Sequence, residues 1–344
     1  MCLEEGRNFI ADHQGICSHF LLMDADHIFK NDKPTSSILA DLTEDAYSIQ
    51  ERSYHHVYWM NRIVKASTPF EYAGAVHEYL RHSLHMQYSV AELSGVYLMH
   101  NPNWHIGNEK WLRDVNALEK ALDENPEDRR SHFYLGNTYS ALGRYDDAIY
   151  HWKERIMLGG WREEVFMSAY YIAQAMEKVF WQKRSLNAST IDFLSSWLSF
   201  MANDSQPNVT SVVEAYAASS LILPYRREPI YDIGRLYRTY LNDFENCYQY
   251  SKMALSLSDS SRHTLFMAAD IYLFRVEEQI CICAYYTKRY CEGMKNCKAT
   301  VEILTGRGYS DTSHAHLLAR NRAASNMAYY YNVLTTEGGL SNCD

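Results

Sequence analysis

Apolar residues recur at helical intervals through much of the chain. Residues 109–122 place apolar side chains four, three and four positions apart, as on one buried helix face, at Trp111, Val115, Leu118 and Leu122. Asparagine and proline at positions 125 and 126 then end this predicted helix. Similar patterns predict helices over residues 163–178, 212–223 and 265–290, whereas the composition of residues 187–210 predicts a loop.

Residues 129–158 have the spacing of a helix-turn-helix hairpin of the tetratricopeptide type. Gly136 and Ala148 would let the two helices approach closely, and Gly143 would make the turn between them. The same frame recurs, with a proline ten residues before a glycine in both copies: Pro126 and Gly136, then Pro224 and Gly234. Such hairpins bury their apolar faces only against neighbouring hairpins, so the pattern predicts a stacked array.

The first part of the chain contains β-rich segments at residues 47–50 and 56–60, and an apolar run over residues 20–29 that carries Asp24 and Asp26. Side chains alternate with a period of two in a strand, so these two carboxylates can leave a strand end on the same side. Paired carboxylates suit Mg²⁺ or Mn²⁺ bridged to a substrate phosphate. A strand that ends in a solvated turn explains the same residues without a metal.

Composition narrows the classes of function. The chain has 344 residues, 47% of them hydrophobic, which is enough for two domains or for one domain with a repeat array. The formal net charge of -9 argues against a protein that wraps nucleic acid. No uncharged apolar run reaches the roughly eighteen residues of a membrane span, and the first residues do not resemble a signal peptide. We therefore expect a cytoplasmic protein without a membrane span.

Cysteines and tyrosines are abundant but predict no chemistry. Of the 8 cysteines, the four that lie closest together lack the paired Cys-x-x-Cys spacing of structural zinc sites: Cys281, Cys283, Cys291 and Cys297. In a chain without an export signal, we interpret them as ordinary buried thiols on helices. We interpret the 28 tyrosines mostly as packing residues with a polar tip.

Three segments together resemble the second half of a family 2, GT-A type glycosyltransferase domain: Gly6-Arg7-Asn8-Phe9, Phe20-Leu21-Leu22-Met23-Asp24-Ala25-Asp26 and Gly74-Ala75-Val76-His77-Glu78. The resemblance is to the branch in which tetratricopeptide-like helices follow the sugar-transferring domain. It implies an α+β fold, with a partial GT-A-like α/β domain over residues 1–105 and an all-α repeat array over residues 106–344. Only about twenty residues precede Asp24, so we expect the base-binding N-terminal part of the catalytic domain to be missing.

The same resemblance implies a metal and nucleotide-sugar site. Asp24 and Asp26 would hold Mn²⁺ or Mg²⁺ on the diphosphate of a nucleotide-sugar donor, and Arg7 would open the helix that precedes their strand. His77 and His100 are further candidate metal ligands. A hydrogen-bonded imidazole that binds no metal is the alternative interpretation of either histidine.

Glu78 is the candidate general base. In an inverting transfer, the acceptor hydroxyl must lose its proton as it attacks the sugar, which requires a carboxylate within hydrogen-bond reach. The bound ion would neutralise the leaving nucleotide diphosphate. The helical repeats would hold the acceptor, a protein or a glycan, in front of Glu78.

Three functions compete on the sequence. We expect a metal-dependent inverting glycosyltransferase, inactive alone if the missing half is required. The alternative is a non-catalytic tetratricopeptide scaffold that binds a protein partner on its helices and carries a remnant of the sugar-transferring domain. A metal-dependent hydrolase is less favoured, because no His-x-His or His-Glu-x-x-His pattern places several ligands on one element.

Overall fold

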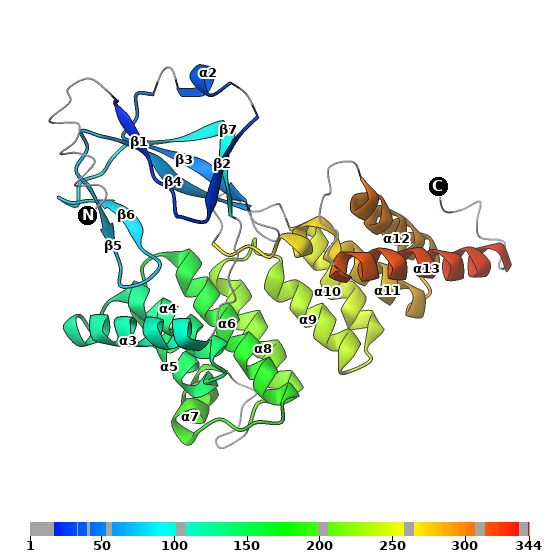
Figure 1. Ribbon diagram of the computed structural model, residues 1–344. Coiled ribbons are helices and arrows are strands. Elements are labelled where there is room, and N and C mark those ends of the chain that lie inside the picture. Colours follow the sequence, from blue (N-terminus) through cyan, green and yellow to red (C-terminus); the bar gives the residue numbers. More distant parts are fainter. Residues whose placement is uncertain are drawn as a thin grey trace. The chain divides into compact units, whose positions relative to one another are not determined.

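The computed structural model describes residues 17–32, 34–39, 42–52, 57–100, 108–198, 206–257, 265–306, 314–336 and 343. They fall into two compact units, Met1–Tyr134 and Leu135–Asp344, so the division lies within helix α4. The first unit contains the strands and the second contains most of the helices (Figure 1). The sequence-based boundary at residues 105 and 106 lies instead in the segment between β7 and α3, after the last strand of the sheet.

The first unit is built on a five-stranded sheet in the order β1-β4-β3-β7-β2. All neighbouring strands are antiparallel except β3 and β7, which are parallel. The strands of this sheet are β1 His19–Leu21, β2 His27–Asn31, β3 Ala46–Arg52, β4 Val57–Lys65 and β7 Val90–His100, and the short helix α2 Thr35–Leu39 lies between β2 and β3 in the sequence. The described residues of the predicted β-rich segments lie in β3 and β4, and β4 continues to Lys65.

Strand β3 lies at the centre of this sheet and is buried on both faces at its start. Tyr47 and Ile49 point to one face, where they pack with Ile63, Val96 and Leu98. The alternate position Ala46 packs on the other face with Val64 and Phe70. Successive side chains of a strand alternate between faces, so one short segment contributes to two apolar clusters.

A separate two-stranded sheet pairs β5 Phe70–Ala73 with β6 Tyr79–His82. The loop between them contains Gly74, whose φ of +105° is a backbone conformation that glycine adopts without a steric penalty. In the same unit, Arg130 at the start of α4 donates a hydrogen bond from Nη2 to the carbonyl oxygen of His77, at 2.7 Å. This contact connects the hairpin loop to the first helices of the chain.

Helices fill the rest of the described chain. Their bounds are α3 Asn108–Glu124, α4 Arg129–Ala141, α5 Tyr145–Met157, α6 Arg162–Trp181, α7 Ala188–Trp197, α8 Val209–Ile222, α9 Glu228–Thr239, α10 Phe244–Ser256, a π-helical turn η1 Ile271–Arg275, α11 Val276–Tyr286, α12 Tyr290–Thr305 and α13 His314–Thr336. From α5 onward, each helix packs on the next, with α7 set aside as an insertion between α6 and α8. The array of helical hairpins is therefore confirmed.

The predicted roles of the glycines are confirmed at three positions. Gly143 has a φ of +72° and makes the turn between α4 and α5. A Cβ atom at Gly136 would lie 2.5 Å from Nε1 of Trp152, and one at Gly234 would lie 3.2 Å from the backbone oxygen of Cys247. Each glycine of the repeated frame therefore sits where two helices approach closely.

Two predicted segments differ from the structure. The predicted loop at residues 187–210 contains α7, whose first turn is capped because the Asn187 side chain accepts a hydrogen bond from the backbone N–H of Thr190. The predicted long helix at residues 265–290 is divided, since α11 ends at Tyr286 and α12 begins at Tyr290. A strong local cap in the first case and a turn in the second override the composition of the segment.

The interpretation of the cysteines as free thiols is wrong for six of them. The structure pairs them in three disulfides, Cys247–Cys283, Cys281–Cys297 and Cys291–Cys343, with Cα atoms 6.2, 4.9 and 5.0 Å apart. These separations suit a disulfide. The bonds link α10 to α11, α11 to α12, and α12 to the segment after α13, because the packing of the hairpins brings together cysteines that lie far apart in sequence.

Candidate functional site

The predicted metal site lies in the first unit, but Asp24 and Asp26 do not end a buried strand. Strand β1 ends at Leu21, and both aspartates lie in the turn that leads into β2. The N–H of His27 donates to the carbonyl oxygen of Asp24 at 3.1 Å and closes this turn. The side chain of Asp24 is 61% exposed. A turn does not impose the period-two alternation that the prediction required.

Arg62 already supplies a cation to Asp24. Its Nη2 lies 2.9 Å from Oδ2 of Asp24, and its Nε lies 2.5 Å from Oε1 of Glu51. Burial alone would lower the pKa of Arg62, but Glu51 and Asp24 outweigh it and raise that pKa. His27 lies beside both carboxylates, 3.7 Å from each. The cluster is therefore a charge network in which one arginine of the protein contacts both carboxylates.

Among the described residues, no group of three or more histidine, cysteine, aspartate or glutamate side chains is arranged to hold a metal. The His77 ring stacks on Tyr134 with 4.3 Å between ring centroids. Burial, together with Lys110 and Arg130, lowers the pKa of His77. Arg7 and the side chain of His100 lie outside the described residues, so their roles stay predictions.

Glu78, the candidate base, lies in the loop between β5 and β6 and is exposed. Burial raises the pKa of Tyr72, and the charges of Asp24 and Glu78 act in the same direction. The base role of Glu78 and the ligand roles of Asp26 and His77 are not tested by this geometry. They stay predictions.

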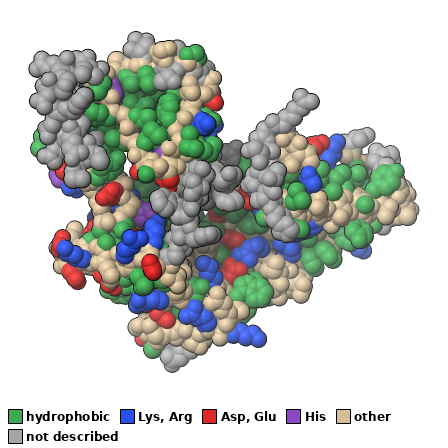
Figure 2. Space-filling model, in the orientation of Figure 1, with side chains coloured by type: hydrophobic (Ala, Val, Ile, Leu, Met, Phe, Trp, Pro, Cys, Tyr) green, Lys and Arg blue, Asp and Glu red, His purple; other side chains and the backbone are tan. Residues whose placement is uncertain are grey.

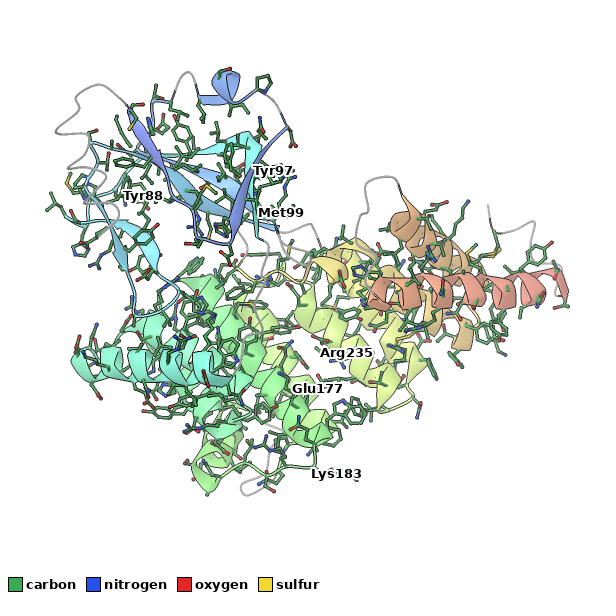
Figure 3. All side chains as sticks on the ribbon, in the orientation of Figure 1. Tyr88, Tyr97, Met99, Glu177, Lys183 and Arg235 are labelled. Atoms are coloured by element: carbon green, nitrogen blue, oxygen red, sulfur yellow. A yellow bond between two sulfur atoms is a disulfide. The ribbon has the colours of Figure 1, made fainter. Side chains whose placement is uncertain are left out.

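A second polar cluster, which the sequence did not predict, connects α6, α8 and α9. The hydroxyl of Tyr170 donates to Asp232 at 2.6 Å, and that of Tyr216 donates to Glu177 at 2.8 Å. Arg235 donates two hydrogen bonds to Glu177, at 2.8 and 2.7 Å, and one to Asp232 at 2.8 Å. Figure 3 labels Glu177 and Arg235, which come from α6 and α9.

This cluster is satisfied from within the fold. Burial raises the pKa of Asp232, whereas the carboxylates of Asp232 and Glu177 raise the pKa of Arg235 in spite of its burial. Burial and Asp232 together raise the pKa of Tyr170 well above its usual value. Since the charged atoms have partners, the cluster holds three helices in register. The sequence signal that could have indicated it is the arginine directly after Gly234 of the repeated frame.

The first helices of successive hairpins form one side of the array, and part of that side is exposed to solvent. We call α6, α9, α11 and α13 the inner row, because α11 packs on both α9 and α13, and side chains of α6 and α9 are hydrogen-bonded to each other. On α6, the stripe that α5 and α8 leave partly exposed is Tyr171, Gln174 and Lys178. On α9, the corresponding stripe is Tyr231, Arg235 and Arg238. Both stripes follow the three- and four-residue spacing of one helix face.

No family model and no curated protein matches the chain. Among solved structures, MamA is 15% identical, and the match covers 59% of this chain and 96% of that one with a TM-score of 0.38. TTC0263, a thermophilic TPR protein of Thermus thermophilus, is 15% identical over 64% and 92% of the two chains, with a TM-score of 0.37. YrrB, described as a TPR protein with an unusual peptide-binding site, is 11% identical over 65% and 99%, with a TM-score of 0.34. Likenesses at these scores decide nothing, and the repeat assignment rests on the chain's own helices.

The recognition of a family 2 glycosyltransferase is wrong. No matching family model or curated protein supports this recognition, and none of the solved structures reported above is described as a glycosyltransferase. The geometry agrees with this correction, because the sheet is antiparallel at all but one strand pair and Asp24 is occupied by Arg62. The described helices also include none long and apolar enough to cross a membrane.

Proposed function

We propose that this chain is a non-catalytic interaction scaffold that binds a protein partner on the inner row of its helical array. Stacked helical hairpins create an extended surface from residues on successive repeats, which is how such arrays bind partners. The observation that carries the proposal is the continuity of the inner row. Arg235 of α9 bonds to Glu177 of α6, and Arg322 of α13 lies 3.3 Å from Glu278 of α11.

The inner row also keeps polar and aromatic groups available for contact. Tyr171 and Gln174 are partly exposed on α6, and Lys178 is exposed one turn further along. Mixed aromatic and polar side chains are typical of protein interfaces. YrrB is described as having a peptide-binding site, and a peptide or an extended segment is the kind of partner that we propose here.

Site-specific crosslinking tests this proposal on the full chain. A photo-reactive amino acid would replace Lys178 on α6 in one variant and Lys298 on α12 in a matched variant, since both lysines are exposed on helices. We expect a discrete adduct with one partner from the Lys178 position and none from the Lys298 position. Equal adducts at both positions, or none at Lys178, would contradict an inner-row binding surface.

We also infer that the protein matures in an oxidising compartment rather than in the cytoplasm. The support is the set of three disulfides among the last helices, because such bonds persist where thiols are not kept reduced. Mass spectrometry of alkylated protein, isolated from its source without a reductant, tests this inference. We expect six of the cysteines to be protected when the protein is unfolded and alkylated without a reductant, and labelling of Cys281 and Cys297 under these conditions would contradict the inference.

A further inference from the structure

The partly exposed stripe of α9 carries two arginines, and the fold pairs only one of them with carboxylates. Tyr231, Arg235 and Arg238 follow one another at intervals of four and three residues, so all three lie on one face of the helix. The opposite face, with Ile230, Ile233 and Leu236, is buried. Arg235 is fully engaged with Glu177 and Asp232. The remaining cation of the stripe is Arg238.

Arg238 has no acidic partner among the described residues. Its Nε atom is buried and forms no hydrogen bond. The nearest carboxylate in electrostatic terms, Glu278, already lies 3.0 Å from Nη1 of Arg275 and 3.3 Å from Nη1 of Arg322. Buried polar groups are nearly always hydrogen-bonded, so a donor left without an acceptor needs an explanation.

The surroundings of Arg238 are unfavourable for a cation. Burial lowers the pKa of Arg238, and the charges of Arg322 and Arg235 act in the same direction, whereas Tyr231 and Glu278 offset part of the effect. Its position in the last turn of α9 offsets part of this effect, because the carbonyl end of a helix favours a positive charge. The helix end does not supply a hydrogen bond to Nε, so the guanidinium stays under-satisfied in the free protein.

We propose that Arg238, with Arg235 and Arg322 beside it, is a docking site for an acidic segment of a protein partner. The inference rests on the proposed scaffold function and names the chemistry of the partner. A glutamate or aspartate side chain can accept hydrogen bonds from a guanidinium in a bidentate geometry. Such a segment complements the unbalanced charge of this stretch of the inner row.

The place of the site on the inner row suits an extended segment. Arg322 is 47% exposed and comes from α13, whereas Arg235 is 25% exposed and comes from α9. A segment laid across α9 and α13 would meet the exposed Arg322 first and then the more deeply placed Arg238. Figure 2 shows acidic and basic side chains side by side over the middle of the helical array, in the region of α9.

Fluorescence anisotropy with defined peptides tests the proposal on the full chain. The probe is a labelled short peptide that alternates glutamate and alanine, and its matched control replaces every glutamate with glutamine. We expect the acidic peptide to bind at least about tenfold more tightly than the control, which corresponds to roughly 1.4 kcal/mol. Binding should weaken as salt is raised from low to physiological concentration, since the contact is between charges.

Two variants locate the site. R238Q removes the unbalanced charge, and K298Q removes one charge from the outer helix α12, where Lys298 is 67% exposed. We expect R238Q to weaken binding of the acidic peptide about tenfold and K298Q to leave it unchanged. The free R238Q protein should melt no lower than the wild type, and the acidic peptide should raise the melting temperature of the wild type but not that of R238Q.

The outcomes separate this inference from the scaffold function. Equal binding of the acidic peptide to wild type and R238Q, or equal loss in R238Q and K298Q, overturns the Arg238 site. Crosslinking from the Lys178 position can still succeed in that case, so the scaffold would stand with a partner of different chemistry. If crosslinking fails but the acidic peptide still binds selectively, the scaffold function is overturned and an anion-binding site at Arg238 is left.

Discussion

The two units of the molecule differ in how their buried arginines are paired with carboxylates. In the sheet unit, Arg62 is buried and contacts the carboxylates of Glu51 and Asp24 directly. In the helical unit, Arg238 has no carboxylate of its own among the described residues, and its Nε atom is buried without a hydrogen bond. The first arginine is explained by its contacts within the fold, whereas the second is the basis of the proposed docking site. The contrast directs attention from the predicted metal site to the inner row of helices.

The largest expected effect comes from Arg62. Arg62→Met would leave the carboxylate of Glu51, which is only 2% exposed, without this cation, and we expect the sheet to lose about 3 to 5 kcal/mol of stability. Hydrogen exchange of peptides from β3 and β4 in increasing urea measures this loss. The control, Arg81→Met, breaks an exposed pair with Glu71 and should cost at most about 1 kcal/mol. Equal losses in the two variants would remove the basis for treating the Arg62 cluster as structural.

The next largest effect is expected in the disulfides. Replacing Cys281 and Cys297 with alanine opens a loop with a sequence separation of 16 residues, which should cost about 3 kcal/mol. Urea unfolding of α11 and α12, followed by hydrogen exchange, measures this cost. Blocking the exposed free thiol of Cys17 serves as the control and should change nothing. If the double variant is as stable as the wild type under oxidising conditions, the bond does not form.

A smaller effect tests the packing of the repeat frame. Gly136→Ala should cost about 1 to 3 kcal/mol, because the new Cβ would lie 2.5 Å from the Trp152 indole. The matched background is Trp152→Phe, whose smaller ring should relieve the contact. A double-mutant cycle measured by urea unfolding should therefore show favourable coupling between the two changes. Additive effects would mean that the helices do not approach closely at this position.

The smallest expected effect concerns pH. The pKa of His77 is lowered in the folded state by burial and by Lys110 and Arg130, so the unfolded chain binds the proton more readily. At neutral pH the imidazole is neutral in both states, and the full stability is present. As the pH drops below the pKa of the unfolded state toward that of the folded state, the unfolded chain gains a proton that the folded protein does not, and the stability falls. His77→Gln should flatten this decline, and NMR titration of His77 measures the pKa directly. A His77 pKa at or above its usual value would contradict the stacking of this ring on Tyr134 beside Lys110 and Arg130.

Local patterns predicted most of the helices, and long-range contacts explain what they missed. The apolar face of residues 109–122 and the glycines of the repeated frame act within one helix or one hairpin, so spacing alone indicated α3, α4 and α5. The partners Asp24 and Arg62 are separated by 38 residues, and no local pattern connects them. The disulfides likewise depend on how whole hairpins stack.

The geometry around the predicted site also depends on contacts between residues far apart in sequence. Asp24 and Asp26 have the spacing that two metal-binding carboxylates would need, but the chain enters a turn after Leu21 and an arginine from β4 approaches Asp24. Arg238 carried no distinguishing signal in the sequence. Its significance comes from the positions of Glu278, Arg275 and Arg322 on other helical segments, where the two arginines already engage the glutamate.

The free energy of unfolding of Arg238→Met tests the central contrast most directly. Urea unfolding of the full chain, with hydrogen exchange reporting on α9, compares this variant with the wild type. Because Arg238 is a cation without a carboxylate among the described residues, we predict that the variant is as stable as the wild type or more stable. A loss of about 3 kcal/mol or more, the size expected for a broken buried ion pair, would contradict an unbalanced charge on the inner row.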